Sequence, residues 1–306
     1  MISHFVRKRK FPPLDALFQG NASSTLQVVI MKGKTCLITG GTSGIGKETA
    51  LALARMGAAI VFTARDENRG KAAKKELVDQ SGNNDIDYVF CDLSSLQSVK
   101  ECSQIFRSSH SRLDVLINNA GTWVKERKLS KDGIELTFAV NHLAHFLLTN
   151  RLLDLLKSST PSRVISVTSG LHGGTIDFDD IGFERRFKGM WAYRQSKLAN
   201  ILFIKELARR LEGTAVTANC LMPGMVNTGL SRSSGAMSKA IFKLLASKPE
   251  KGAMTSIYLA SSPDVEKISG NCFSKSRVVE TSKESNDPEV AKRLWEVSVG
   301  YVQKWL

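Results

Sequence analysis

A glycine-rich turn between an apolar run and a helical pattern constrains the fold of this chain more than any other feature. Residues 34–39 (KTCLIT) have the length and composition of a buried strand, and residues 47–56 follow a helical pattern. Glycines let the backbone between them turn tightly and approach a pyrophosphate, whose charge the free N–H groups of a helix start attract. A purely structural glycine turn is the alternative. The residues predicted to bind a dinucleotide here are Gly40, Thr42, Ser43, Gly44, Ile45 and Gly46.

The alternation of apolar runs and helical patterns continues along the chain. Further strands are predicted at 59–64, 86–91, 113–117, 163–168 and 215–221, and helices at 67–80, 96–108, 133–157 and 192–211. Such alternation predicts a parallel sheet with helices on both faces. The expected fold class is therefore α/β, with a single Rossmann-type, doubly wound domain over residues 31–306. In this fold ligands bind beyond the carboxyl ends of the strands.

A second constellation combines a phenol, an amine and a hydroxyl. Tyr193 and Lys197 lie four residues apart in a predicted helix, so they share one face. The charge of Lys197 then favours the ionised form of Tyr193 and lowers the pKa of its hydroxyl. Ser169 lies upstream, directly after an apolar strand pattern. This layout predicts a proton-transfer site, although the Y-x-x-x-K spacing alone is typical of an exposed helix face.

Three further segments carry a resemblance to a known family. They are residues 192–200 (AYRQSKLAN), 175–180 (TIDFDD) and 141–146 (NHLAHF). Together with the glycine turn and residues 118–121 (NNAG), they make the chain similar to the short-chain dehydrogenase/reductase family, and to its retinol-dehydrogenase-type branch, over residues 32–276. The resemblance implies a nicotinamide-dependent oxidoreductase that interconverts carbonyls and alcohols on fairly apolar molecules. A non-catalytic NADP-sensing protein on the same fold is the alternative, but such a protein does not require a proton donor.

The resemblance also implies a catalytic set. Tyr193 is expected to exchange a proton with the substrate oxygen, and Ser169 to hydrogen-bond that oxygen. Lys197 is expected to hold the nicotinamide ribose. Tyr193 is also expected to contact the cofactor. Asn141 is expected to support a water-linked proton path from the lysine.

Other residues are implied to contact the cofactor at the adenine, along its middle or at the nicotinamide carboxamide. These residues are Asp92, Leu93, Asn119, Ala120, Gly121, Pro223, Gly224, Val226 and Thr228. A helix cap remains the alternative for Asp92, and an ordinary turn for residues 223–224. Asn118 is expected to tie neighbouring strands together rather than to touch substrate.

The residues after the second predicted strand bear on cofactor choice. Arg65 lies 19 residues after Gly46, at the distance where a dinucleotide enzyme contacts the adenosine ribose. Ala64 stands where an acidic residue would favour NAD, so Arg65 can pair with the 2′-phosphate of NADP. NADP(H) is therefore favoured over NAD(H). Asp66 argues against this, because its carboxylate could reach a ribose hydroxyl.

A formal net charge of +14 raises the question of anionic partners. Lys and Arg are dispersed over predicted helices without an interleaved aromatic platform, which argues against nucleic-acid binding. An anionic cofactor, or peripheral contact with an acidic membrane surface, accounts for the charge equally well. No run of about 18 apolar residues predicts a membrane span. The five scattered cysteines favour reduced thiols and a cytoplasmic location.

Three histidines and one tryptophan lie close in sequence to the motifs, and their neighbours indicate their roles. His142 and His145 lack an evident third ligand, so packing or surface positions are favoured and no metal site is predicted. His172 follows Ser169 closely and Trp191 precedes Tyr193, which makes both candidates for lining the substrate entrance. A core position is the alternative for Trp191.

The ends of the domain and one internal segment allow several interpretations. Residues 1–30 are basic and acid-poor, and are expected to be a flexible accessory extension, with organelle targeting or a surface-binding arm as alternatives. Residues 225–248 fit a substrate lid, and simple packing on the domain is the alternative. The helix predicted over residues 288–305 is expected to cover the rim or contact a second subunit, so a homodimer remains an option.

Overall fold

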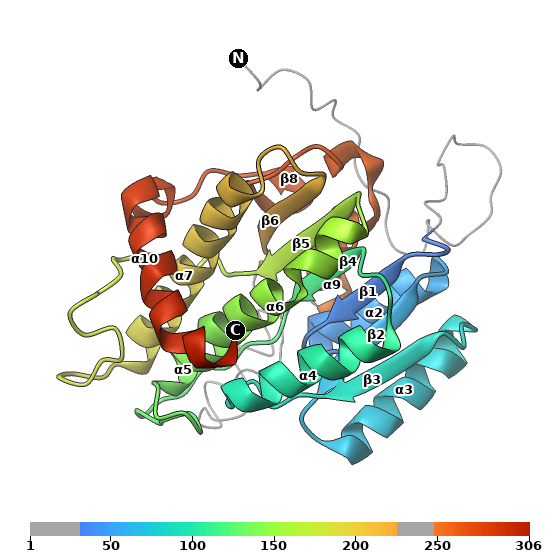
Figure 1. Cartoon of the computed structure of the whole chain (residues 1–306), viewed down its shortest axis with the longest axis horizontal. Helices are drawn as coiled ribbons and strands as arrows, with labels where there is room; N and C mark the ends of the chain where they lie inside the picture. The colour runs from blue at the N-terminus through green and yellow to red at the C-terminus, as the bar shows by residue number, and fades with distance from the viewer. Residues whose placement is uncertain (1–30, 225–247) are drawn as a thin grey trace.

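An eight-stranded sheet runs through the protein in the order β3-β2-β1-β4-β5-β6-β7-β8 (Figure 1). The computed structural model describes residues 31–224 and 248–306. Neighbouring strands pair in parallel, except for the antiparallel pair β7 and β8. The strands are β1 (Thr35–Ile38), β2 (Ala59–Ala64), β3 (Ile86–Phe90), β4 (Val115–Asn118), β5 (Ser162–Val167), β6 (Val216–Met222), β7 (Cys272–Ser274) and β8 (Arg277–Val278).

Helices cover both faces of the sheet, as the sequence predicted. One layer consists of α2 (Gly44–Arg55), α3 (Glu67–Ser81) and α9 (Pro249–Ser261). The opposite layer contains α4 (Leu96–Ser109), α6 (Ala144–Ser158), α7 (Gly189–Arg210) and α10 (Pro288–Val302), with α10 alongside α7 (Figure 1). The short segments are α5 (Leu136–Phe138), the π-helical turn η1 (Ala139–Leu143) and the 3₁₀ turns η3 (Pro263–Val265), η4 (Glu284–Asn286) and η5 (Gln303–Trp305).

The predicted strands agree with the observed ones to within two residues at each end, which confirms the doubly wound α/β fold. The single helix predicted over 133–157 is wrong in detail, because this stretch contains a loop, α5, η1 and α6 in succession. The sequence did not predict α9, β7 or β8. The two strands have only three and two residues, which is too short for an alternating pattern to be recognised.

Two hydrophobic cores form because the strands are buried on both faces. In β1, Leu37 packs into the core beneath α4 and α6, whereas Cys36 and Ile38 point into the core beneath α2 and α9. All five cysteines are buried free thiols. The sheet is thereby fixed between two helical layers, and its strand ends are the natural places for a site.

The order of the strands reverses between β1 and β4, which are adjacent in the sheet although two strands separate them in sequence. The chain leaves β1 towards α2 on one face, and the segment after β4 leads to α6 on the other. A crevice at such a switch point is where doubly wound folds bind ligands. The glycine turn at 40–46 and residues 119–121 therefore meet at the same edge.

A buried carboxylate ties the opposite edge of the sheet together. Asp114 is 1% exposed and accepts hydrogen bonds from Lys34 Nζ (2.9 Å), Arg112 Nε (2.8 Å) and the Thr35 N–H (2.9 Å). Burial alone would raise the pKa of Asp114, but the hydrogen bonds from Arg112 and Lys34 outweigh it and leave the pKa below its usual value. This carboxylate links the starts of β1 and β4.

Replacing Asp114 by Ala is expected to cost about 2–4 kcal/mol of unfolding free energy, because two cations and one backbone N–H lose their common partner. Asp79→Ala is the control, since Asp79 pairs with Lys75 on the surface of α3 and is expected to contribute less than about 0.5 kcal/mol. Urea unfolding measures both values. Equal effects of the two substitutions would show that Asp114 does not hold the strand starts together.

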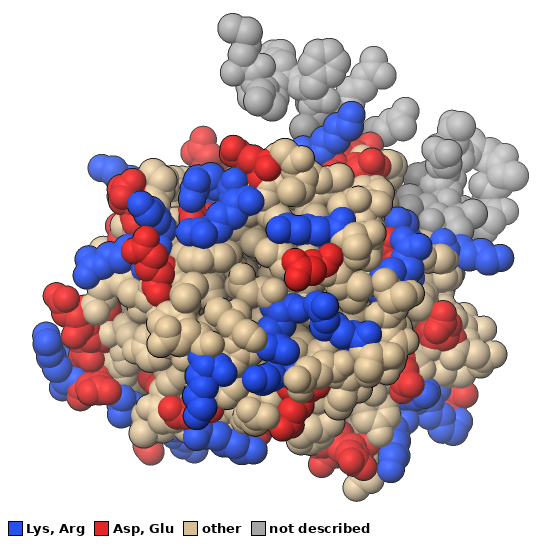
Figure 2. Space-filling model, viewed as in Figure 1, with Lys and Arg blue, Asp and Glu red and all other residues tan. Residues whose placement is uncertain are grey.

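Several predictions concern residues outside the described ranges. These are the extension at 1–30, all of the expected lid except residue 248, and the two carboxamide contacts Val226 and Thr228. Among the described residues, no helix combines the length and apolar character needed to cross a bilayer. Basic side chains are spread over the face shown in Figure 2, with acidic side chains among them.

Candidate active site

The glycine turn has a backbone that side chains would not permit. Gly40 and Gly44 have φ of +72° and +60°, in the left-handed region that glycine tolerates. A Cβ added to Gly46 would come within 2.5 Å of the Gly40 carbonyl oxygen, and one on Gly41 within 2.4 Å of the Phe62 Cβ. The turn can therefore bring α2 close to β1 only with glycine at these positions.

The first turn of α2 is arranged for an anion. Ser43 occupies the N-cap in an extended conformation, yet its side chain makes no capping hydrogen bond, and the first turn contains no acidic residue. The N–H groups at this end of α2 therefore have no side-chain acceptor among the described residues. Free N–H groups and the positive end of the helix dipole suit a phosphate, so the turn fits the dinucleotide that its sequence predicts.

Thr39 connects the glycine turn to the residues after β4. Its hydroxyl oxygen accepts the N–H groups of Asn119 (2.9 Å) and Ala120 (3.0 Å). The Asn119 amide donates back to the Thr39 carbonyl oxygen at 2.8 Å. Asn118, which was expected to tie strands together, instead donates its side-chain N–H to Thr149 on α6 at 3.0 Å, so that prediction was wrong. The reason is that the Asn118 side chain projects from the sheet towards the helix layer.

The predicted proton-transfer residues come together at the carboxyl end of β5. Ser169 follows β5, and its hydroxyl accepts the Leu171 N–H at 3.1 Å and lies close enough to the Tyr193 phenol of α7 to lower the pKa of that phenol. The Lys197 Nζ lies 5.7 Å from the centre of the Tyr193 ring and donates to the Val167 carbonyl oxygen at 3.1 Å. The structure thus places a phenol, a hydroxyl and an amine in one group, next to the crevice beside β4.

Burial is the main cause of the pKa shifts of Tyr193 and Lys197. It lowers the pKa of Lys197 to about 8 and raises the pKa of Tyr193, although the nearby Ser169 hydroxyl offsets part of the rise in the Tyr193 pKa. The sequence predicted that Lys197 lowers the pKa of Tyr193, but in this structure the net shift of that pKa is upward. The phenolate loses more by leaving water than it gains from an amine that is directed at the Val167 carbonyl.

Asn141 lies on the π-helical turn η1 and reaches two elements of the site. Its side-chain oxygen accepts the Thr122 N–H at 2.7 Å, and its amide donates to the Thr122 carbonyl oxygen at 3.0 Å. The amide also donates to the Ser196 hydroxyl at 2.9 Å, one residue before Lys197. A Cβ on Gly121 would lie 3.4 Å from the Asn141 Oδ1 and 3.5 Å from the Lys197 Nζ. Asn141 therefore holds the loop after β4 against α7.

Arg65, Asp66 and Asp92, which were expected near the adenosine end of the cofactor, each have different local contacts. Arg65 is exposed directly after β2. Asp66 is the N-cap of α3, and its carboxylate accepts the Arg69 N–H at 2.8 Å. Asp92 accepts Ser94 hydrogen bonds and forms an ion pair with Lys131 at 2.8 Å, while Leu93 beside it is buried. Ser95 caps α4, so the helix-cap alternative for Asp92 is wrong.

The remaining candidates flank the proton-transfer group. His172 donates from Nδ1 to the Ser169 carbonyl oxygen (2.9 Å) and accepts the Ser282 N–H at Nε2 (3.4 Å), so both ring nitrogens are occupied. Trp191 is 48% exposed with the Lys188 Nζ 4.0 Å above its ring, which excludes the core alternative. Pro223 and Gly224 follow β6 at the same edge. His142 and His145 are buried, and the described residues contain no cluster of three or more metal-ligating side chains.

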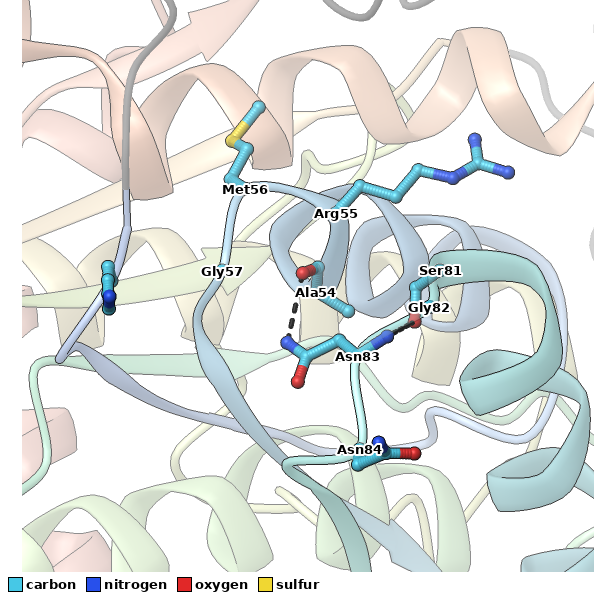
Figure 3. Close-up of a pocket in the computed structure, with 9 residues that line it drawn as sticks. Ala54, Arg55, Met56, Gly57, Ser81, Gly82, Asn83 and Asn84 are labelled. Atoms are coloured by element: carbon cyan, nitrogen blue, oxygen red, sulfur yellow. Dashed lines mark hydrogen bonds between the residues drawn. The ribbon is translucent and has the colours of Figure 1, made fainter.

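A shallow pocket between the carboxyl ends of α2 and α3 lies at the other end of α2 (Figure 3). The Asn83 amide crosses it and donates to the carbonyl oxygens of Ala54 (3.0 Å) and Ala58 (2.9 Å). Its polar lining is thus engaged in joining two helix ends. The proton-transfer residues do not contribute to it, so this pocket is separate from the candidate active site.

Comparisons with known proteins agree with this geometry. The family model described as short chain dehydrogenase matches residues 34–239. The chain belongs to the short-chain dehydrogenase family. As a member it is an NAD(P)-dependent oxidoreductase that acts on CH–OH groups.

Curated relatives and solved structures extend the likeness over most of the chain. Human retinol dehydrogenase 14 is 45% identical over 289 residues, which cover 88% of this chain and 86% of the relative. Human retinol dehydrogenase 13 is 43% identical over 280 residues, or 88% and 85% of the two chains. A crystal structure of an uncharacterised protein from Mycobacterium paratuberculosis superimposes with a TM-score of 0.74 at 32% identity, and covers 90% of this chain and 95% of that one.

Replacing Lys197 by Met is expected to stabilise the unliganded protein at pH 7 by up to about 3 kcal/mol, because the buried ammonium is removed. The folded pKa of about 8 lies below the ordinary value of 10.5. Between these pH values the unfolded chain binds more protons than the folded chain, so the stability of the wild type rises with pH. The advantage of the variant should therefore shrink by pH 10.

Urea unfolding at pH 7 and pH 10 measures this difference, with Lys71→Met on the surface of α3 as a control that should change little. A Lys197 variant that is less stable than the wild type at pH 7, with a gap independent of pH, would contradict the burial argument.

Proposed function

We propose that this short-chain dehydrogenase interconverts a carbonyl and an alcohol on a lipophilic, retinoid-like molecule with NADP(H), and that Tyr193 is its proton donor and acceptor. The observation that carries the proposal is that Ser169 lies close enough to Tyr193 to lower the pKa of its phenol, with the buried Lys197 amine one helical turn away and 5.7 Å from the centre of the Tyr193 ring. This group lies at the strand edge that also carries the glycine turn.

The dinucleotide supplies a hydride donor or acceptor when it is bound. Residues proposed to hold it are the glycine turn, the N–H groups of α2 and the loop at 119–121. Tyr193 is neutral at pH 7, because burial raises its pKa, so it carries the proton that a reduced carbonyl oxygen requires. Ser169 donates a hydrogen bond to the same oxygen as negative charge develops there.

Lys197 acts on the phenolate that remains after Tyr193 has given up its proton. With a pKa of about 8, its amine is largely protonated at pH 7. A buried cation near the Tyr193 ring stabilises that negative charge more than a cation in water would. In alcohol oxidation the same residues work in reverse, with Tyr193 as the proton acceptor.

Preference for NADP(H) rests on the residues after β2. The Asp66 carboxylate is occupied as the cap of α3, which weakens the argument that it binds a ribose hydroxyl. Arg65 is exposed beside it and makes no salt bridge among the described residues, so it is available for a 2′-phosphate. An NADP active-site complex of RhlG from Pseudomonas aeruginosa has the same fold at 26% identity, with a TM-score of 0.65 over 80% of this chain and 95% of that one.

A lipophilic substrate is supported by the surface around the proton-transfer group. Leu171 follows Ser169 by two residues, and Met190 and Trp191 precede Tyr193; these side chains are 51%, 44% and 48% exposed. Exposed apolar side chains beside a site favour an apolar ligand. The relatives named retinol dehydrogenase 13 and 14 support a retinoid-like alcohol or aldehyde as the substrate class.

Tyr193→Phe is expected to lower kcat by at least 10²-fold, because it removes the proton donor. The NADPH dissociation constant should change by less than about threefold, since one hydroxyl at the reacting end is lost. Steady-state kinetics with a lipophilic aldehyde and NADPH fluorescence titration give the two values. Retention of more than a tenth of the wild-type kcat would reject Tyr193 as the donor.

Arg65→Ala is expected to weaken NADPH binding by about 10–100-fold while NADH binding changes little, because one charge-assisted contact to the 2′-phosphate is lost. Lys71→Ala on the exposed surface of α3 serves as the control. Equal weakening for both cofactors, or a wild-type preference for NADH, would overturn the NADP assignment and direct attention to Asp66.

A further inference from the structure

The imidazole of His145 has a single tautomer in this structure. His145 lies on α6, is 1% exposed, and burial lowers its pKa to about 4, so the ring is neutral at pH 7. Its Nδ1 lies 3.0 Å from the Asn141 carbonyl oxygen, which can only accept. Nδ1 therefore carries the proton, and Nε2 is left as an acceptor.

Thr39 supplies the proton for that acceptor. The Thr39 hydroxyl lies 2.9 Å from His145 Nε2, and its oxygen already accepts the N–H groups of Asn119 and Ala120. Its hydroxyl proton is therefore free to point at the imidazole. A carbonyl oxygen at Ile117 is the competing acceptor, but at 3.4 Å it is more distant. The hydrogen bonds thus all run in one direction: from the Asn119 and Ala120 N–H groups to the Thr39 hydroxyl, from that hydroxyl to His145 Nε2, and from His145 Nδ1 to the Asn141 carbonyl oxygen.

This series of hydrogen bonds ends at the carbonyl oxygen of Asn141, which lies in the turn η1. In η1 the hydrogen bonds span five residues, as in the Ala144 N–H to Ala139 carbonyl bond, so the ordinary helical pairing is interrupted there. The His145 ring supplies a donor to the Asn141 carbonyl within this interruption. The Asn141 side chain in turn binds Thr122 and Ser196, and the Ser196 hydroxyl donates to the Tyr193 carbonyl oxygen at 2.7 Å.

We infer that His145 is a positioning residue for the site: its imidazole holds the Asn141 turn in register with the loop at 119–120, and thereby fixes α7 near Tyr193 and Lys197. The inference rests on the proposed function, because it assigns His145 to turnover rather than to folding alone. No contact between His145 and the substrate is required.

His142 provides a matched comparison one turn earlier. It is also buried and neutral, since burial lowers its pKa to about 3, but its Nε2 bonds to the Ser298 hydroxyl of α10 at 2.8 Å. Two buried histidines therefore lie close to Asn141 in sequence, His142 on η1 and His145 at the start of α6, and their rings contact different elements. His145 contacts Thr39, which directly follows β1, whereas His142 contacts Ser298 on α10.

Two amide substitutions separate the two hydrogen bonds of His145. The Asn amide nitrogen can take the place of Nδ1, so His145→Asn keeps a donor for Asn141 and loses the Thr39 contact. The Gln amide reaches the place of Nε2, so His145→Gln keeps an acceptor for Thr39 and loses the Asn141 contact. We expect each variant to lower kcat about tenfold relative to the wild type, with KM for the aldehyde within about threefold, because each loses one end of the connection between the Asn141 turn and the loop at 119–120.

His142→Gln is the control, and is expected to lower the melting temperature while kcat and the NADPH dissociation constant stay near the wild-type values. A kcat near the wild-type value in either His145 variant, or a loss of kcat in His142→Gln as large as theirs, would overturn the inference. Nitrogen NMR of the wild type with labelled histidine tests it without a substitution: a neutral ring protonated at Nδ1 is expected, and protonation at Nε2 would overturn it. A wild type that binds NADPH but converts no carbonyl or alcohol would instead refute the proposed function.

Discussion

The burial of the Lys197 amine is the constraint on which the architecture of the site depends. The described residues contain no carboxylate paired with it, and the amine donates a hydrogen bond to the Val167 carbonyl oxygen. An amine in such a position costs free energy, and its pKa of about 8 reflects that cost. The surrounding elements therefore have to be fixed by other interactions. Gly121 leaves room beside the amine, and Asn141 joins the neighbouring loop to α7.

The sheet separates stabilising interactions from the chemistry. At the starts of β1 and β4, Asp114 is saturated by cations and a backbone N–H. At the carboxyl ends of the same strands, Thr39 and the loop at 119–120 form a hydrogen-bonded hub, while the first turn of α2 keeps N–H groups without side-chain acceptors. At the edge where the strands start, polar groups with all their hydrogen-bond partners hold the fold together. At the edge where the strands end, the N–H groups that lack a side-chain acceptor are available to bind a ligand.

Much of the fold could be predicted from sequence because its signals are local. The glycine turn, the alternating strands and the Tyr193 to Lys197 spacing each require only neighbouring residues. The direction of the Tyr193 pKa shift could not be predicted. The spacing shows that an amine is near, but it does not show how deeply the phenol is buried, and burial raises the pKa. Asp66 stayed ambiguous in sequence, and its contact with the Arg69 N–H shows how the carboxylate is used. His145 was assigned to packing or surface, since its contact with Thr39 joins residues 106 positions apart.

The most direct test of the account follows a label from cofactor to product. NADPH carrying deuterium at the reactive C4 position would be incubated with the protein and a lipophilic aldehyde of the retinoid class, and the alcohol analysed by mass spectrometry. The account predicts an alcohol with one carbon-bound deuterium from the wild type, and the loss of nearly all of this product when Tyr193 is Phe. A protein that binds NADPH yet transfers no label to any lipophilic aldehyde or ketone would contradict it.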